Sequence, residues 1–244
     1  MFYFNGDSFV YGLELEDINN RFSTLVSKHY NKKELNDSIR GASNQRIFRT
    51  TMEAIASFPN IESIVIMWTD PNRFEHFLGP NMFSADDDGW RRITTYRLKP
   101  DNFLPNERDT FIKNFHHPDI RVINKSLLEY SVHVRTQDHV INELLNQILQ
   151  LQLVCTLKNI NCKMSYTYIS DILDNQNVKT YIKNHNLYNK IDWTTKYWLD
   201  NDIFWSMNTF CKEQNVDFGP GLHPLESGHR LVANKIIDVF KKDK

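Results

Sequence analysis

The stretch Ile61–Trp68 constrains the fold more than any other part of the sequence. It reads IESIVIMW, a nearly continuous run of β-branched and other apolar residues. A strand needs such a run when both of its faces are buried, as they are in a parallel sheet covered by helices on two sides. The stretch therefore predicts a central strand of an α/β protein.

Strand and helix patterns alternate along the rest of the chain. Runs of apolar residues ending at turn signals predict strands, and apolar residues at helical spacing predict helices. This alternation predicts a parallel sheet with helices on both faces. The expected strands are 2–5, 34–39, 61–68 and 162–169, with a further candidate strand at 120–124 in the first irregular region. The expected helices are 22–30, 43–58 (with Ser43 as N-cap), 136–158 and 225–242.

Two irregular regions, at about 74–135 and 171–216, are expected to be insertions in a single domain that spans residues 1–244. The chain has 29 basic and 30 acidic residues, so no basic field favours nucleic acid as a partner. It has no apolar run long enough to cross a membrane and no secretory signal pattern at its start. Its three cysteines form no CxxC pair, which is typical of a reduced interior, and we expect a cytoplasmic location.

The carboxyl ends of the strands in such a sheet form the edge where ligands bind. The first strand ends at Asn5 and leads directly into Gly6-Asp7-Ser8. A serine on such a turn is exposed and has backbone N–H groups nearby, as a nucleophile requires. Alternatively, Ser8 caps the next helix. A phosphate-binding loop is disfavoured because the segment lacks the GxxxxGK[ST] pattern.

A second candidate, His223, lies in a loop rich in glycine and proline just before the last predicted helix. That position brings it to the same edge of the sheet as Ser8, where it is expected to act as the general base. We expect no metal and no cofactor. His116-His117 lacks a third ligand at metal spacing, and the acidic run 86–88 lacks the alternating ligands of a calcium loop.

Together these segments resemble the SGNH, or GDSL-type, hydrolases. Gly6-Asp7-Ser8 with Gly12 matches the first motif of that family, Asn36 to Gly41 is similar to the second, and His223-Pro224 followed by Gly228-His229 is similar to the last. The resemblance implies a three-layer α/β/α sandwich with a flavodoxin-like parallel sheet. It also implies that Ser8 attacks an ester carbonyl, that His223 is the base, and that the N–H groups of Ser8 and Gly41 hold the oxyanion.

The chain departs from the family pattern at two places. Pro220 stands three residues before His223, where the family has its acid, so a backbone carbonyl of residues 219–221 or the nearby Asp217 is expected to orient the histidine. By strand alignment, Asp70 takes the place of an asparagine that donates to the oxyanion. Asn72 is then the expected third donor, with Arg73 as an alternative. Asp7, Asp70 and Arg73 are the expected substrate-binding residues.

Two functions fit these residues. The first is hydrolysis of an acyl or acetyl ester on a small molecule or a glycan. The second is a binding or structural module on the same fold that has lost catalysis and recognises a glycan. The aromatic residues of the second insertion, Trp193, Trp198 and Trp205, either stack on sugar rings or line an acyl pocket, or they form a small satellite core. The first insertion is a candidate lid.

Overall fold

A parallel sheet forms the centre of the computed structural model, which describes residues 1–77, 90–93, 129–130 and 133–242. Its strand order is β2-β1-β3-β6, with every neighbouring pair parallel. Each prediction of a strand in this sheet is confirmed. The bounds are β1 (Phe2–Asn5), β2 (Glu34–Asn36), β3 (Ser63–Trp68) and β6 (Asn161–Tyr166).

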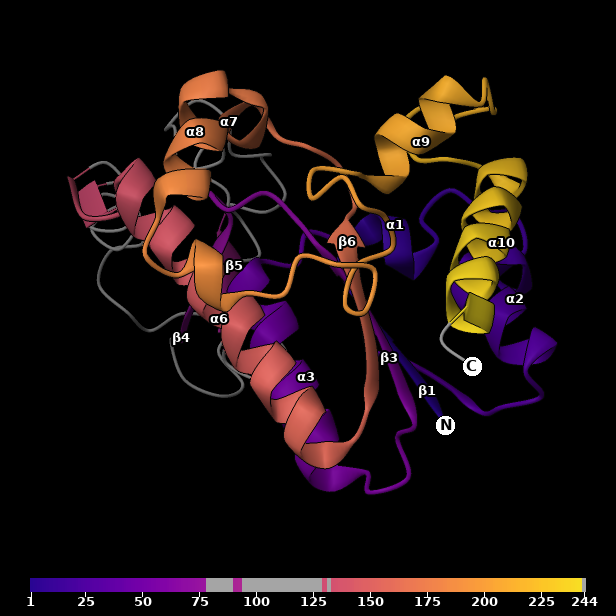
Figure 1. Cartoon of the computed structure of the whole chain (residues 1–244). Coiled ribbons are helices and arrows are strands. Elements are labelled where there is room, and N and C mark those ends of the chain that lie inside the picture. The colour runs from indigo at the N-terminus through magenta and orange to yellow at the C-terminus, as the bar shows by residue number, and fades with distance from the viewer. Residues whose placement is uncertain (78–89, 94–128, 131–132, 243–244) are drawn as a thin grey trace, which may run out of the picture.

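Helices cover both faces of the sheet (Figure 1). Helices α3 (Asn44–Ser57) and α6 (Gln137–Lys158) lie on one face, and α2 (Phe22–His29) and α10 (Glu226–Lys242) lie on the other. The three-layer α/β/α prediction is therefore confirmed. Strand β3 is apolar throughout because both of its faces are buried. Ile64, Ile66 and Trp68 belong to the core on the α3 side, whereas Val65 and Met67 belong to the core on the α10 side.

The helix boundaries follow local capping chemistry. Ser43 accepts a hydrogen bond from the N–H of Arg46 at 3.1 Å and begins α3, as predicted. Thr136 begins α6 in the same way, accepting from the N–H of His139 at 3.3 Å. Helix α6 ends at Asn159, which adopts the left-handed conformation that terminates many helices.

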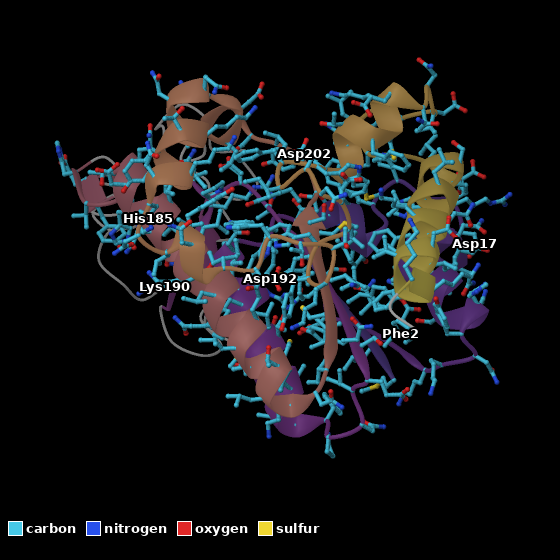
Figure 2. All side chains as sticks on the ribbon, viewed as in Figure 1. Phe2, Asp17, His185, Lys190, Asp192 and Asp202 are labelled. Carbon is cyan, nitrogen blue, oxygen red and sulfur yellow. The ribbon has the colours of Figure 1, made fainter. Side chains whose placement is uncertain are left out.

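The second insertion contains α7 (Asp171–Asp174), α8 (Gln176–Asn184), η4 (Tyr188–Lys190) and α9 (Met207–Glu213). The stretch between η4 and α9, on which Figure 2 labels Asp192 and Asp202, runs beside β6. Trp193 and Trp198 stack there with ring centroids 5.0 Å apart, and their indole N–H groups donate to backbone carbonyls. Because Trp198 is only 2% exposed, these two residues extend the core rather than present a sugar-stacking surface.

The first insertion contains an antiparallel pair that the sequence pattern did not predict. Strands β4 (Phe74–Phe77) and β5 (Trp90–Ile93) pair with each other and are separate from the main sheet. The strand expected at 120–124, the lid residues between 78 and 89, the His116-His117 pair and the acidic run 86–88 lie outside the described residues. Within the described ranges, no helix is both long and apolar enough to cross a membrane.

Candidate active site

The first motif places Ser8 at the carboxyl end of β1. Asp7 adopts an extended conformation and caps the short helix α1 (Ser8–Tyr11), so Ser8 is the first helical residue rather than the cap. Gly6 passes so close to Val10 and to the carbonyl oxygen of Met67 that a side chain there would collide with them. The turn after β1 therefore needs a glycine, and it sets Ser8 at the edge of the sheet.

Asp7 is fully buried and holds this turn in place. Its Oδ1 accepts from the N–H of Phe9 at 3.1 Å, and its Oδ2 accepts from Thr69 Oγ1 at 2.8 Å and from Arg73 Nη1 at 2.9 Å. Thr167, just beyond β6, donates to the same oxygen at 3.3 Å. Asp7 thus connects the ends of three strands. Its hydrogen bonds place Asp7 in this anchoring network, and a contact with substrate stays a prediction.

Ser8 and His223 lie side by side, as the sequence predicted. Ser8 Oγ is 2.9 Å from Nε2 of His223, although the two residues are 215 positions apart in the chain. The loop that carries His223 is closed by a bridge between Phe218 and Pro224, just before α10. The ring of Phe9 lies 4.8 Å from the imidazole ring and restricts its position. A serine and a histidine in this contact can act as nucleophile and general base.

The carboxylate beside His223 comes from Glu14, not from Asp217. Glu14 Oε2 is 2.8 Å from His223 Nδ1 and also accepts from the backbone N–H of His223 at 3.2 Å, while Oε1 accepts from the N–H of Gly221 at 2.6 Å. The N–H of Gly221 and the contacts with His223 lower the pKa of Glu14 below its usual range. Asp217 is exposed, and its backbone carbonyl accepts from the N–H of Leu225.

Glu14 was not predicted from the sequence because the residues around it form no motif that indicates a catalytic role. The residue stands in the acidic segment Leu13-Glu14-Leu15-Glu16-Asp17, which has the composition of a solvated loop. One structural feature sets it apart from the rest of this segment: Glu14 has φ = 72°, a left-handed conformation. This conformation is uncommon outside glycine, and residues that adopt it cluster at functional sites.

Gly41 lies in the loop after β2. It has φ = 68°, and nothing lies within 4 Å of the position that a Cβ would take. The loop before it is held by Asn36, whose side chain accepts from the N–H of Ser38 and donates to the carbonyl of Val10. Asn36 therefore ties the start of the loop that carries Gly41 to α1.

The end of β3 is held by a residue that the sequence analysis did not single out. Asn44 exchanges two hydrogen bonds with the backbone of Thr69, donating to its carbonyl at 3.0 Å and accepting from its N–H at 2.8 Å. Beyond Thr69, Asp70 folds back on its own turn, since Oδ1 accepts from the N–H of Asn72 at 3.0 Å and its carbonyl accepts from the N–H of Arg73. Arg73 packs over the ring of Tyr168 and pairs with Asp7.

His229 supports the site from α10 without reaching it. It is fully buried, and its Nδ1 accepts from the N–H of Phe22 at 3.1 Å, which ties α10 to the start of α2. Burial, with smaller contributions from nearby Arg21 and His223, lowers its pKa from 6.5 to about 3, so the ring is neutral at physiological pH. In the described part of the chain, no group of three or more His, Cys, Asp or Glu side chains could hold a metal ion.

Known structures share this fold over almost the whole chain. The chain is similar to a psychrotrophic esterase, EstA, from Pseudoalteromonas sp., with 12% identity over 99% of this chain and 96% of that one, and a TM-score of 0.54. It is also similar to TesA, with 10% identity over 99% and 98% of the two chains and a TM-score of 0.53. A lipolytic protein of the G-D-S-L family from Veillonella parvula matches with 15% identity over 98% and 97%, and a TM-score of 0.49.

No protein-family model and no curated protein matches the sequence. The structural likeness nevertheless confirms the resemblance drawn from the motifs: the chain has the SGNH, or GDSL-type, hydrolase fold. One of these structures, EstA, is described as an esterase.

Proposed function

We propose that this protein is a serine hydrolase that cleaves an ester bond with Ser8 as nucleophile and His223 as general base. The contact of 2.9 Å between Ser8 Oγ and His223 Nε2 carries this proposal. A chain that had kept only the fold would have no physical need to hold a serine hydroxyl and an imidazole together at its sheet edge. The structural similarity to EstA, an esterase whose structure was determined with monoethylphosphonate as inhibitor, also supports ester hydrolysis.

The reaction proceeds in two steps. His223 Nε2 takes the proton of Ser8 Oγ as that oxygen attacks the ester carbonyl, and it then gives the proton to the departing alcohol, leaving an acyl group on Ser8. A water molecule attacks the acyl-enzyme in the second step, again with His223 as the base. The acid is released and Ser8 recovers its proton.

The oxyanion formed in each step lies between α1 and the Gly41 loop. The N–H of Ser8 belongs to the first turn of a helix, where backbone donors lack helical partners. Gly41 supplies the second N–H, and its lack of a side chain leaves the space beside it open. We assign the third donor to the side-chain amide of Asn72, because Asp70 Oδ1 holds the backbone of Asn72 in the turn at the end of β3.

For the substrate we propose an acyl or acetyl ester, with the alcohol either a small molecule or a carbohydrate. Arg73 and Asp70 at the end of β3 are the proposed charged contacts beside the reacting carbonyl, Arg73 through the part of its guanidinium that does not face Asp7. The aromatic pair Trp193 and Trp198 gives no support to a carbohydrate, because it is part of the core.

Labelling with a fluorophosphonate probe tests the proposal. We expect one equivalent of label on the wild-type protein and none on Ser8→Ala, followed by hydrolysis of p-nitrophenyl acetate that both Ser8→Ala and His223→Ala abolish. A folded wild-type protein that takes no label and leaves the acetate ester intact would contradict the proposal. That result would favour the binding module, which glycan arrays would then test.

A further inference from the structure

The loop that carries His223 is shaped around a carboxylate from the opposite end of the chain. Glu14 and His223 are 209 residues apart, yet three nitrogen atoms converge on the Glu14 carboxylate: the backbone N–H groups of Gly221 and His223, and the ring Nδ1 of His223. All three nitrogens belong to residues 221–223. Such a set of contacts to one carboxylate fixes the position of both partners.

Two glycines make room for this carboxylate. A Cβ on Gly219 would lie 2.7 Å from the carboxyl carbon of Glu14, and a Cβ on Gly221 would lie 3.0 Å from its Oε2. The residue between them, Pro220, stands where the family resemblance places the acid. The Gly-Pro-Gly sequence lacks the acid that the family resemblance places there. Its two glycines leave a space that the carboxylate of Glu14 fills.

The charge state of Glu14 decides which nitrogen of His223 carries the proton. An ionised carboxylate can only accept hydrogen bonds, so its contact at 2.8 Å requires a proton on His223 Nδ1. In the neutral ring, Nε2 is then an acceptor, and it faces Ser8 Oγ at 2.9 Å. The serine proton consequently has an acceptor in line with it, which is the arrangement that general-base catalysis needs.

We propose that Glu14 is the positioning acid of this active site, and that the chain has moved this role from the histidine loop to the loop that follows the nucleophile helix. The inference rests on the proposed hydrolase function. Glu14 does not touch the substrate in this scheme. It orients His223, selects the reactive tautomer and stabilises the imidazolium that forms when Ser8 loses its proton.

Three variants test this role against p-nitrophenyl acetate. Glu14→Gln keeps the shape but offers an amide, and we expect kcat to fall by about 10³-fold to 10⁴-fold with little change in KM. Glu14→Ala should lose as much and should recover in part when formate is added, since the small carboxylate fits the space left between Gly219 and Gly221. Glu16→Gln, in the same loop but exposed, is the matched control and should keep the wild-type rate.

A relocation variant gives a sharper test. Glu14→Ala combined with Pro220→Asp puts a carboxylate three residues before His223. We expect kcat of this double variant to be at least tenfold higher than kcat of Glu14→Ala.

The outcomes separate this inference from the proposed function. Proton NMR detects the proton on His223 Nδ1 as a low-field resonance, and we expect it in the wild type and in the inactive Ser8→Ala, but not in Glu14→Ala. This measurement tests the contact between Glu14 and His223 even if the protein hydrolyses no ester. Wild-type kcat in Glu14→Gln, a larger loss in Asp217→Asn than in Glu14→Gln, or a low-field resonance that persists in Glu14→Ala would overturn the inference.

Discussion

Asp7, the residue before Ser8, forms an ion pair with Arg73, with Asp7 Oδ2 2.9 Å from Arg73 Nη1. The carboxylate of Asp7 is fully buried, whereas the guanidinium of Arg73 keeps a small exposed fraction. Thr69 donates to the same oxygen and also accepts from Arg73. Asp7 is thereby tied to the end of β3, so the stability of this network and the position of Ser8 are coupled.

Removing Arg73 should therefore cost both stability and activity. Arg73→Ala leaves a buried carboxylate without its cation, and we expect a loss of about 3 kcal/mol in the free energy of unfolding. Urea denaturation measures this loss as a lower midpoint. The double variant Arg73→Ala with Asp7→Asn should be more stable than Arg73→Ala alone, because a neutral amide needs no countercharge. A double variant no more stable than the single one would argue against the ion pair as the cause.

The third oxyanion donor can be tested at the end of β3. If the side-chain amide of Asn72 donates to the oxyanion, Asn72→Ala should lower kcat by about 10²–10³-fold with little change in KM. Its turn should persist, since the backbone of Asn72 supplies the bond to Asp70. Steady-state kinetics with p-nitrophenyl acetate measures the effect, and an unchanged kcat would transfer the role to Arg73.

The buried His229 should make stability depend on pH below neutrality. Its pKa is about 3 in the folded state and near 6.5 when unfolded, so the unfolded chain binds the extra proton between these values. Stability from this group is complete above about pH 6.5 and falls as the pH drops, by up to about 1.4 kcal/mol per pH unit.

Urea midpoints measured between pH 7 and pH 5 cover this effect with little contribution from carboxylates, which titrate mainly at lower pH. His229→Asn keeps an acceptor for the N–H of Phe22 but cannot take up a proton, and its midpoint should change less over this range. Equal slopes in the wild type and in His229→Asn would show that other groups cause the dependence.

The elements that the sequence predicted are those whose signal is local. The apolar run that ends at Trp68 identified β3, the hydroxyl of Ser43 identified the start of α3, and the glycine turn identified Ser8. Glu14 could not be predicted in this way. Its role depends on a contact with a loop 209 residues away and on a left-handed backbone that no letter of the sequence signals. The pairing of β4 with β5 was not predicted for a similar reason, since these two strands form a sheet separate from the central one.

A methyl group at Gly219 should separate activity from stability. Ala fits the backbone there, because Gly219 does not adopt a left-handed conformation, but its Cβ would lie 2.7 Å from the carboxyl carbon of Glu14. The carboxylate is the free end of a flexible side chain and can move away at little cost in folding free energy. We therefore expect Gly219→Ala to unfold within a few degrees of the wild type and yet to lose about 10²-fold or more in kcat, because a displaced carboxylate no longer orients His223.

Gly221→Ala should have a smaller effect on kcat, since its Cβ would lie 3.0 Å from the nearest carboxylate oxygen rather than 2.7 Å from the carboxyl carbon. Gly228→Ala is a useful contrast within the same region. Its Cβ would meet Pro224, Cys211 and Val216 inside the core, so its main effect should be a lower melting temperature. Thermal melts and steady-state kinetics on the three variants give the comparison, and a Gly219→Ala protein with wild-type kcat would show that the position of the Glu14 carboxylate does not limit the reaction.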